Sequence, residues 1–529
     1  MAGMSLLVVN HARVWNPSRD GAEPAEARAV WIHDGRITQL TPTAAAPAPG
    51  ARDDVRVLSF PGAVVMPAFL DAHFHLLSLA HHSLRGDLSE ARDAEDVVAV
   101  LGARAAAEAG DGPVVGVDFD ESAWRDSALP TRAMLNAVSA TRPVYARRVC
   151  CHVGVANDAL LARLASPARF IDAQSGRIVE DAVFEANRLT RPPGPALVAA
   201  IDGAIAHLHR LGITAIHDIV DPDSLDVYIA GLGESRRPLR IAAYLHAAAA
   251  DFTALRARLS PLAARGVRAV GVKVFADGSL GGRTAALHAP YADGDGTGEL
   301  LVSREGLGAE LERCAREGIA CAVHAIGDRA VCTVLDAMDD ARRAAGRPGR
   351  FRIEHAEILG APELERCQRL RVPLVMQPNF VRSWGGEGGM YESRLGRERW
   401  EGNNPFASLE RADVPFVFSS DGMPAGPLFG LRGATRHPVE HQRLDPARAF
   451  YRYTTAAADV FRAGDAGDDS PVTVSRVTPG APADLVVLSA HPLLADSDRL
   501  RVEATFAGGT EVYRAPPLPR ATNHSKHRR

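Results

Sequence analysis

Eight apolar, strand-like runs alternate with helical patterns along the sequence. Such alternation is typical of βαβ units, whose strands pair in parallel. Eight units predict an α/β protein with a (β/α)8 TIM-type barrel, in which catalytic side chains project from the carboxyl ends of the strands. The runs are Val64–Asp71, Ile213–Ile219, Leu239–Leu245, Ala269–Ala276, Ile319–His324, Phe351–His355, Val372–Gln377 and Val414–Asp421.

The first and second runs are separated by more than 100 residues that carry helical and strand patterns of their own. This stretch predicts a large α+β insertion after strand 1, at residues 85–195, that acts as a lid. The rest of the barrel is expected at 63–84 and 196–465. Short strands divided by turns occur at both chain ends, and we expect residues 1–62 and 466–516 to complete one small β-sandwich, followed by a disordered tail at 517–529.

Composition excludes several classes of protein. The chain of 529 residues has a formal net charge of -4, which gives no basic surface for nucleic acid. No apolar run reaches the roughly 18 residues that a membrane span needs. The six cysteines form no CxxC pair and lie in apolar or helical patterns, so they are read as reduced thiols. We therefore expect a cytoplasmic protein with no nucleic-acid or membrane partner, and leave open whether it forms a homodimer.

Lys273 is a basic residue within an otherwise apolar, strand-like run. The chain has two lysines, Lys273 and Lys526, and Lys273 lies between two valines in an apolar stretch bounded by glycine. A buried lysine can lose its proton and act as a nucleophile, form a Schiff base or react with carbon dioxide, whereas arginine stays protonated. The alternative is a structural lysine whose amine extends from a strand end. The composition favours the functional interpretation.

Two His-x-His motifs occur, and periodicity separates them. His73 and His75 follow an expected strand, where residues i and i+2 share a face and can bind one metal ion. His207 and His209 lie in a helical pattern, where such residues diverge by about 200°. We therefore keep the first pair as metal ligands and assign the second pair to a helix surface.

Further candidates end other expected strands: Lys273, His324, His355 and Asp421. Alone, each is more often structural. The strand ends of a barrel converge on one mouth, so these four residues and the pair His73 and His75 predict a metal centre. In this centre a carbamate of Lys273 bridges two cations. A metal-bound water then becomes hydroxide near neutral pH, and Asp421 serves as base toward it and as acid toward the leaving amine. This chemistry is amide-type hydrolysis.

These motifs carry a family resemblance. The order Asp-x-His-x-His, Val-Lys-Val-Phe-Ala-Asp-Gly-Ser-Leu-Gly-Gly-Arg-Thr, His-Ala-Ile-Gly-Asp, Ile-Glu-His and Ser-Asp resembles the amidohydrolase superfamily, and more narrowly its YtcJ-like branch with the N-substituted formamide deformylases. The resemblance implies a metal-dependent hydrolase of non-peptide C–N bonds. It also implies that the insertion helps to cover the substrate, and that the metal centre contains His73, His75, Lys273, His324, His355 and Asp421.

Substrate and metal identity stay open. We expect a small-molecule amide, formamide or cyclic amide, with a deaminase or a lactonase or esterase on the same centre as alternatives and a silent scaffold as a distant one. Zinc is the default metal, as one or two ions, while manganese, iron and nickel fit similar donors. Four residues are expected to contact substrate: His152, Asp277, Arg283 and Gln377. A structural histidine is the alternative for His152, and a salt bridge to a neighbouring loop for Arg283.

Overall fold

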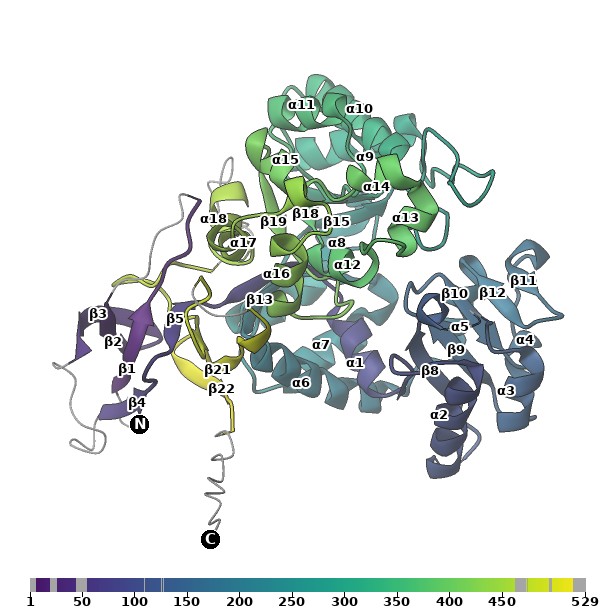
Figure 1. Cartoon of the computed structure of the whole chain (residues 1–529), viewed down its shortest axis with the longest axis horizontal. Coiled ribbons are helices and arrows are strands. Elements are labelled where there is room, and N and C mark those ends of the chain that lie inside the picture. The colour runs from purple at the N-terminus through teal and green to yellow at the C-terminus, as the bar shows by residue number, and fades with distance from the viewer. Residues whose placement is uncertain are drawn as a thin grey trace, which may run out of the picture.

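The computed structural model describes residues 6–516 except 20–25, 44–54, 109, 125, 127, 462–471, 473 and 494–496. The tail expected at 517–529 lies outside the described residues. Within the described part, the chain forms three sheets: a parallel sheet of eight strands, a second sheet built from both chain ends, and a third sheet in the stretch between them (Figure 1).

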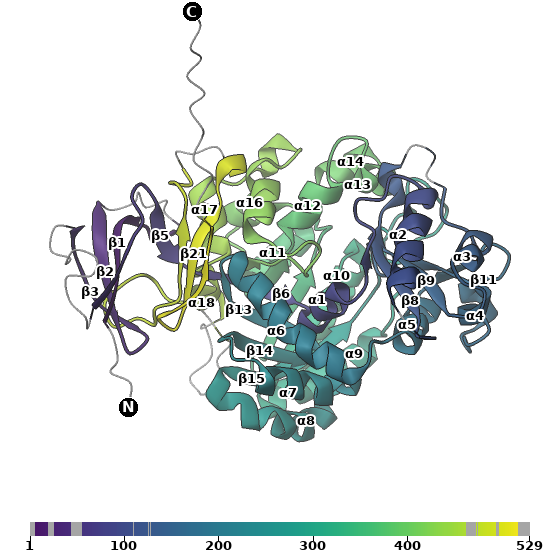
Figure 2. The same ribbon diagram turned by 90° about the horizontal axis from the view of Figure 1, so that it is seen from below.

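The parallel sheet is a nearly closed eight-stranded barrel, which confirms the predicted barrel fold. Its strands run in the order β19-β18-β17-β16-β15-β14-β13-β6, with parallel pairing at each step. Helices surround these strands (Figure 2). The strands are β6 Phe69–Phe74, β13 Ile213–Val220, β14 Arg240–Leu245, β15 Val267–Phe275, β16 Ala320–Ala325, β17 Arg350–His355, β18 Leu374–Met376 and β19 Phe416–Phe418.

Side chains and backbone close the seam between β19 and β6. The buried carboxylate of Asp71 accepts hydrogen bonds from the backbone N–H of Ser420 at 2.9 Å and from its hydroxyl. One residue further on, the backbone N–H of Asp421 donates to the carbonyl of His73 at 3.0 Å. These bonds fix the first strand against the segment that follows the eighth strand.

The first expected barrel run divides into two strands, which corrects the prediction of one strand over Val64–Asp71. Strand β5, Val64–Pro67, pairs with strands of the end sheet, and β6 begins at Phe69 in the barrel. Pro67 has no backbone N–H to donate and therefore suits the point where a strand leaves its sheet. The N–H of Phe69 then donates to the carbonyl of Gly212 at 2.9 Å, just before β13.

The barrel helices follow the strands in alternation. In α10, the buried residues Val331, Val334, Leu335 and Met338 recur at the spacing of one helix face, and the helix ends at Gly346 in the left-handed conformation. The helices outside the insertion are α1 Leu76–Ser83, α6 Gly194–Arg210, α7 Leu225–Glu234, α8 Phe252–Leu259, α9 Arg304–Glu317, α10 Asp328–Ala345, α11 Ala361–Leu370, α12 Pro378–Trp384, α13 Met390–Leu395, α14 Arg397–Glu401, α15 Phe406–Arg411, α16 Pro427–Thr435, α17 Pro446–Arg452 and α18 Ala456–Phe461.

Strands from both chain ends hydrogen-bond into one sheet, in the order β22-β21-β20-β5-β1-β2-β3 with β4 paired to β1. Residues of both ends also share one apolar core, in which Val9 and Ile32 pack with Leu485 and Phe506. The two-layer packing of a sandwich stays a prediction. The strands are β1 Leu6–Val14, β2 Ala27–His33, β3 Arg36–Pro42, β4 Val55–Ser59, β5 Val64–Pro67, β20 Leu485–Leu488, β21 Val502–Ala507 and β22 Thr510–Arg514.

Between β6 and β13 the chain forms a third sheet, in the order β11-β12-β10-β9-β8-β7, with helices of its own. It lies to one side of the barrel, with α1 between them (Figure 1). The expected role of this insertion as a lid stays a prediction. Its elements are β7 Gly86–Asp87, α2 Ala94–Ala107, β8 Val114–Phe119, α3 Arg132–Val138, β9 Val144–Arg148, β10 Val153–Ala156, α4 Asp158–Leu161, β11 Ile171–Asp172, β12 Arg177–Val179 and α5 Asp181–Leu189.

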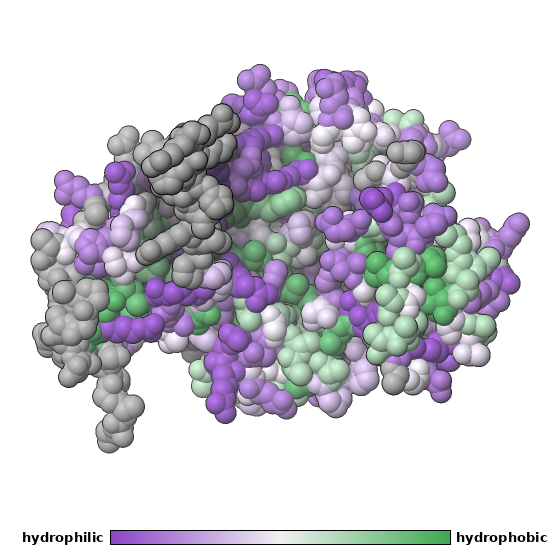
Figure 3. Space-filling view, turned by 60° about the horizontal axis from the view of Figure 1, so that its bottom comes forward, coloured by the Kyte–Doolittle hydropathy of each residue, from purple (hydrophilic) through white to green (hydrophobic). Residues whose placement is uncertain are grey.

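The surface alternates between polar and apolar side chains. Hydrophilic side chains are spread over the face drawn in Figure 3, with apolar patches between them. Among the described residues, none of the helices combines the length and the apolar character that crossing a lipid bilayer requires.

Candidate metal centre

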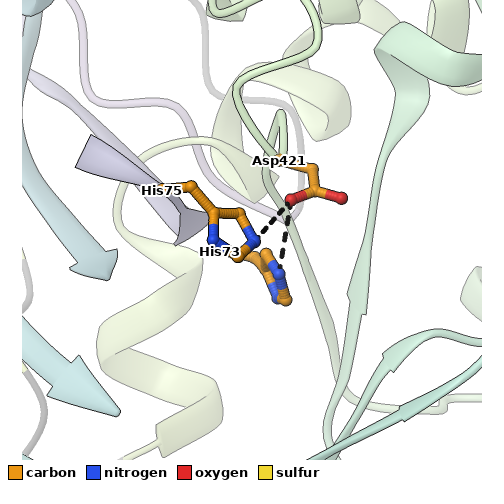
Figure 4. Close-up of side chains that lie close together, drawn as sticks. All are labelled: His73, His75 and Asp421. Atoms are coloured by element: carbon orange, nitrogen blue, oxygen red, sulfur yellow. Dashed lines mark ion pairs between the residues drawn. The ribbon is translucent and has the colours of Figure 1, made fainter. Parts of the chain in front are cut away.

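Three of the expected metal ligands meet at the carboxyl end of the barrel. Strand β6 carries His73, and His75 follows it as the residue that precedes α1, while Asp421 lies in the turn after β19. Asp421 Oδ1 is 3.1 Å from His75 Nε2 and 3.4 Å from His73 Nε2 (Figure 4). The ligand atoms of all three residues lie within 4.8 Å of one another. Imidazole nitrogens and a carboxylate at this spacing fit a divalent cation.

Two further imidazoles stand beside this group. The ring of His355 lies 5.1 Å from that of His73, and the ring of His324 lies 4.4 Å from that of His355. Both are buried. His355 ends β17 with a φ of 73°, and Asp421 has a φ of 57°. Such left-handed backbone costs free energy in residues other than glycine and is concentrated at functional sites. The strained backbone thus presents two of the expected ligands.

Lys273 lies on β15 with 1% of its surface exposed. Its amine has no hydrogen-bond partner in the part of the chain that the structure describes, and it stands 3.8 Å from the centre of the Phe275 ring. Burial lowers the pKa of this amine to about 8, although the carboxylates of Glu354 and Asp421 oppose the shift. A larger fraction of Lys273 is therefore unprotonated at neutral pH than of an exposed lysine, and only the unprotonated amine reacts with carbon dioxide.

Glu354 positions the expected ligand His73, and no motif in the sequence had marked it as a functional residue. Its carboxylate lies 2.5 Å from His73 Nδ1, which directs the other ring nitrogen toward Asp421, and Arg352 forms an ion pair with it at 2.5 Å. Arg352 and Glu354 lie two residues apart and share the inward face of β17. The i, i+2 spacing of Arg352 and Glu354 in the strand that ends with the Ile-Glu-His motif is the sequence signal that could have indicated this pair.

Replacing Glu354 by glutamine should weaken metal binding while keeping the fold. The amide has nearly the shape of the carboxylate but no negative charge to raise the basicity of His73. We expect zinc affinity to fall about 10- to 100-fold, as measured by competition with a chromogenic chelator. Glu410→Gln is the matched control, because Glu410 is also buried and pairs with Arg452 away from the metal centre. Equal zinc affinity in the two variants would contradict the role of Glu354.

Two expected substrate contacts lie behind the imidazoles. Asp277 is buried and accepts backbone N–H groups from Ala286 and Gly327 at 2.9 Å and from Ile326 at 3.0 Å, with His324 Nε2 3.5 Å away. Gln377 is buried as well, with its amide oxygen 2.9 Å from His355 Nδ1 and its nitrogen bonded to Val375 and Ser419. Both residues contact expected ligands, and their contact with substrate stays a prediction.

The other two expected contacts lie in loops outside the barrel strands. His152 follows β9 in the insertion, and its Nδ1 is 2.9 Å from Glu180. Arg283 forms the salt bridge named as its alternative, to Asp293 at 2.9 Å, and its side chain is 46% exposed. A substrate role for either residue stays a prediction.

The second His-x-His motif lies on α6, as the helical pattern predicts. Its expected place on the helix surface is wrong for His209, which is buried with its Nε2 2.9 Å from the carbonyl of Pro238. Helical periodicity gives the relative direction of two side chains, but not which elements pack against them. His207 is partly exposed on the same helix.

Comparisons with known proteins agree with this geometry. A model of the amidohydrolase family matches residues 59–513. The protein YtcJ of Bacillus subtilis, which is assigned to the amidohydrolases, is 26% identical over 528 residues that cover 93% of this chain and 97% of the relative. An N-substituted formamide deformylase of Arthrobacter pascens is 25% identical over 547 residues, covering 92% of this chain and 95% of the relative.

A solved structure has a similar fold. An uncharacterized metal-dependent hydrolase of Pyrococcus furiosus superposes with a TM-score of 0.72 at 27% identity, covering 92% of this chain and 100% of the other. The two sequence relatives and the structural neighbour each cover more than nine-tenths of this chain.

Proposed function

Because this chain belongs to the amidohydrolase family and is a hydrolase, we propose that it cleaves a non-peptide C–N bond of a small-molecule amide, formamide or cyclic amide. The observation that carries the proposal is the contact of Asp421 with both imidazoles of the His-x-His motif, beside a buried lysine whose amine has no hydrogen-bond partner among the described residues. The similarity to an N-substituted formamide deformylase supports a formamide or related amide as substrate.

Similarity to a metal-dependent hydrolase supports a divalent metal, and we propose zinc, as one or two ions, with manganese, iron or nickel as alternatives. His73, His75 and Asp421 would hold it, joined by His324, His355 and a carbamate of Lys273. The carbamate forms when the amine adds to carbon dioxide and releases one proton. A cation in this site would lower the pKa of a bound water molecule toward neutral pH and would polarise the substrate carbonyl.

Asp421 carries the proton in this proposal. Burial tends to raise its pKa, yet the neighbouring His73 and His75 hold it below the usual value, so its carboxylate is ionised at neutral pH. It can therefore accept a proton from the attacking water and donate that proton to the leaving nitrogen. The contacts of Glu354 with His73 and of Gln377 with His355 keep the imidazoles in place during this transfer.

Metal removal provides the direct test. Treatment with a chelator should abolish hydrolysis of the active members of a panel of N-formyl and N-acyl amines, and added zinc or manganese should restore it. Release of an acid together with an amine supports amide cleavage, whereas release of ammonia alone indicates a deaminase, and activity on esters or lactones alone indicates the ester-cleaving alternative. Full activity in a preparation shown to be metal-free would rule the proposal out.

The two His-x-His motifs supply a matched pair of variants for the same assay. His75→Ala should lose bound metal and activity, because it removes a nitrogen that faces Asp421. His207→Ala removes a histidine of the helical motif and should change neither quantity, since His207 lies on α6 outside the metal centre. Metal content measured by elemental analysis on purified protein distinguishes the two results.

A further inference from the structure

A second group of charged side chains lies where α1 meets the insertion. Arg85 follows α1, the helix that begins directly after His75, and Arg147 lies on β9 of the insertion. We call Arg85, Arg147, Tyr145, His81 and Asp118 the junction cluster. The cluster joins the barrel to the insertion, in the region where α1 lies between the two (Figure 1).

The junction cluster contains several buried polar atoms without partners. Arg85 is 7% exposed, and the side chain of Arg147 is 13% exposed. Within the described residues, no hydrogen-bond partner exists for Nε and Nη2 of Arg85, Nε of Arg147, the hydroxyl of Tyr145 or Nε2 of His81. Leaving a buried donor unpaired costs about 1–3 kcal/mol, and more when the group is charged. These unpaired atoms lie on α1 and its end and on β9, which are joined by the contacts of Asp118 with His82 and Arg147, and they indicate a missing acceptor.

Positive charge exceeds negative charge in the junction cluster. Asp118 lies 3.1 Å from His82 and 3.5 Å from Arg147, so its carboxylate is already shared. Burial, together with the charge of Arg147, lowers the pKa of Arg85 to about 10. Burial and the charges of Arg85, Arg191 and Arg147 lower the pKa of His81 to about 3, which keeps that imidazole neutral. An anion beside the two guanidiniums would offset the cost of burying them.

The junction cluster adjoins the metal centre through the turn after β9. Cys151 lies in this turn, between Arg147 and His152 in the chain, with a φ of 61°. Burial raises the pKa of its thiol to about 11, with Arg147 opposing the shift and the carboxylates of Asp118 and Asp421 adding to it. The same turn packs against the loop that follows Lys273, because a Cβ added at Gly281 would lie 3.6 Å from Cβ of Cys150.

We propose that Arg85 and Arg147 form a subsite for a carboxylate carried by the substrate, with the hydroxyl of Tyr145 as an additional donor. The planar guanidinium offers paired N–H groups that match the two oxygens of a carboxylate. The position of the cleaved bond relative to this subsite rests on the proposed function. The binding of an anion by the two arginines does not depend on that function. The substrate class is thus an amide with an anionic group away from the scissile bond, such as an N-formyl or N-acyl amino acid.

Calorimetric titration of the metal-loaded protein with benzoate and with benzamide tests the subsite. The two probes have nearly the same shape and differ in charge. We expect the wild-type protein to bind benzoate about 10- to 100-fold more tightly, which is the range that hydrogen bonds to charged groups provide. Arg85→Met and Arg147→Met should each lower this preference at least about tenfold without changing metal content. Any direct contact of benzoate with the metal is the same in all of these proteins and cancels in the comparison.

Arg132→Met is the matched control, because Arg132 belongs to the insertion but pairs with Asp158 and is 39% exposed. It should keep the full preference for benzoate. If the methionine variants do not fold, Arg85→Lys and Arg147→Lys retain the charge but lack the paired donors, and a lower preference is again expected. Equal binding of benzoate and benzamide by the wild-type protein, or an unchanged preference in the variants of both arginines, would overturn the proposal.

The two proposals fail in different ways. Loss of the benzoate preference in the arginine variants, together with no hydrolysis of any amide by the wild-type protein, would support the subsite and remove the proposed reaction. Hydrolysis of neutral amides together with an unchanged preference in the variants would support the reaction and remove the subsite.

Discussion

Lys273→Ala is expected to lose both its bound metal and its hydrolase activity. The buried amine is the only group that the proposal uses to bind carbon dioxide, and its removal takes two carboxylate-like oxygens from the metal centre. We expect activity to fall to the background of the assay and metal content to fall below that of the wild type. A short carboxylic acid such as acetate or propionate should restore part of both, because its carboxylate can occupy the space of the carbamate.

Lys526→Ala provides the matched control, since Lys526 is the second lysine of the chain. It should retain wild-type metal content and activity. A carbon-13 carbamate signal should appear in the wild type and in this control after incubation with labelled bicarbonate, and be absent from Lys273→Ala. Wild-type metal content in Lys273→Ala would refute the bridging role and leave Lys273 as a structural lysine.

Asp421→Asn is expected to lower kcat/KM about 10²- to 10⁴-fold, the usual contribution of a general acid–base group. Asparagine keeps the shape of the side chain and one oxygen that can bind metal, but it cannot accept a proton at neutral pH. In the wild type, activity should also decline as pH falls through the pKa of Asp421, because the carboxylate must be ionised to accept a proton. The variant should lose this acidic limb of the pH profile.

Asp336→Asn controls for the loss of a carboxylate, since Asp336 pairs with Arg304 and Arg366 on the outside of α10. Its kcat/KM should stay within about twofold of the wild type. Metal content is measured in both variants, so that loss of a ligand can be distinguished from loss of the base. An Asp421→Asn variant that retains more than a tenth of wild-type activity would exclude Asp421 as the proton carrier.

The metal centre is connected to the barrel interior through a chain of polar contacts. Glu354 contacts His73 and Arg352, and Arg352 Nη1 lies 2.8 Å from His217 Nδ1. His217 Nε2 is 2.9 Å from the carbonyl of Val472, and Arg352 lies 4.0 Å above the Tyr244 ring. Each member therefore has partners that restrict its rotation, which holds the ring of His73 in a fixed direction.

The sequence predicted the barrel because its signals are local. Apolar runs bounded by turns and helical patterns can be counted along the chain, and seven of the eight runs correspond to single strands of the barrel. The exception is the run from Val64, which divides at Pro67 between two sheets. Periodicity marks both halves as strand but carries no information about which neighbour each half pairs with.

The contacts of some residues around the expected ligands could not be predicted from the sequence. Glu354 and Asp71 are ionisable residues in apolar runs, and burial raises the pKa of Asp71 to about 7. Their partners lie far along the chain: Glu354 contacts His73, and Asp71 contacts Ser420. Contacts over such separations follow from closure of the barrel, so no local pattern could assign them.

By itself, the sequence determined the alternation of strands and helices, the candidate ligands at the strand ends and the distinction between the two His-x-His motifs, because each depends on the spacing of neighbouring residues. Only the folded chain shows that Asp421 meets His73 and His75, that Glu354 and Gln377 contact the imidazoles, and that Arg85 and Arg147 each bury donors without partners among the described residues. The physical reason is that these contacts form only when strands distant in sequence converge at one end of the barrel and the insertion packs against α1.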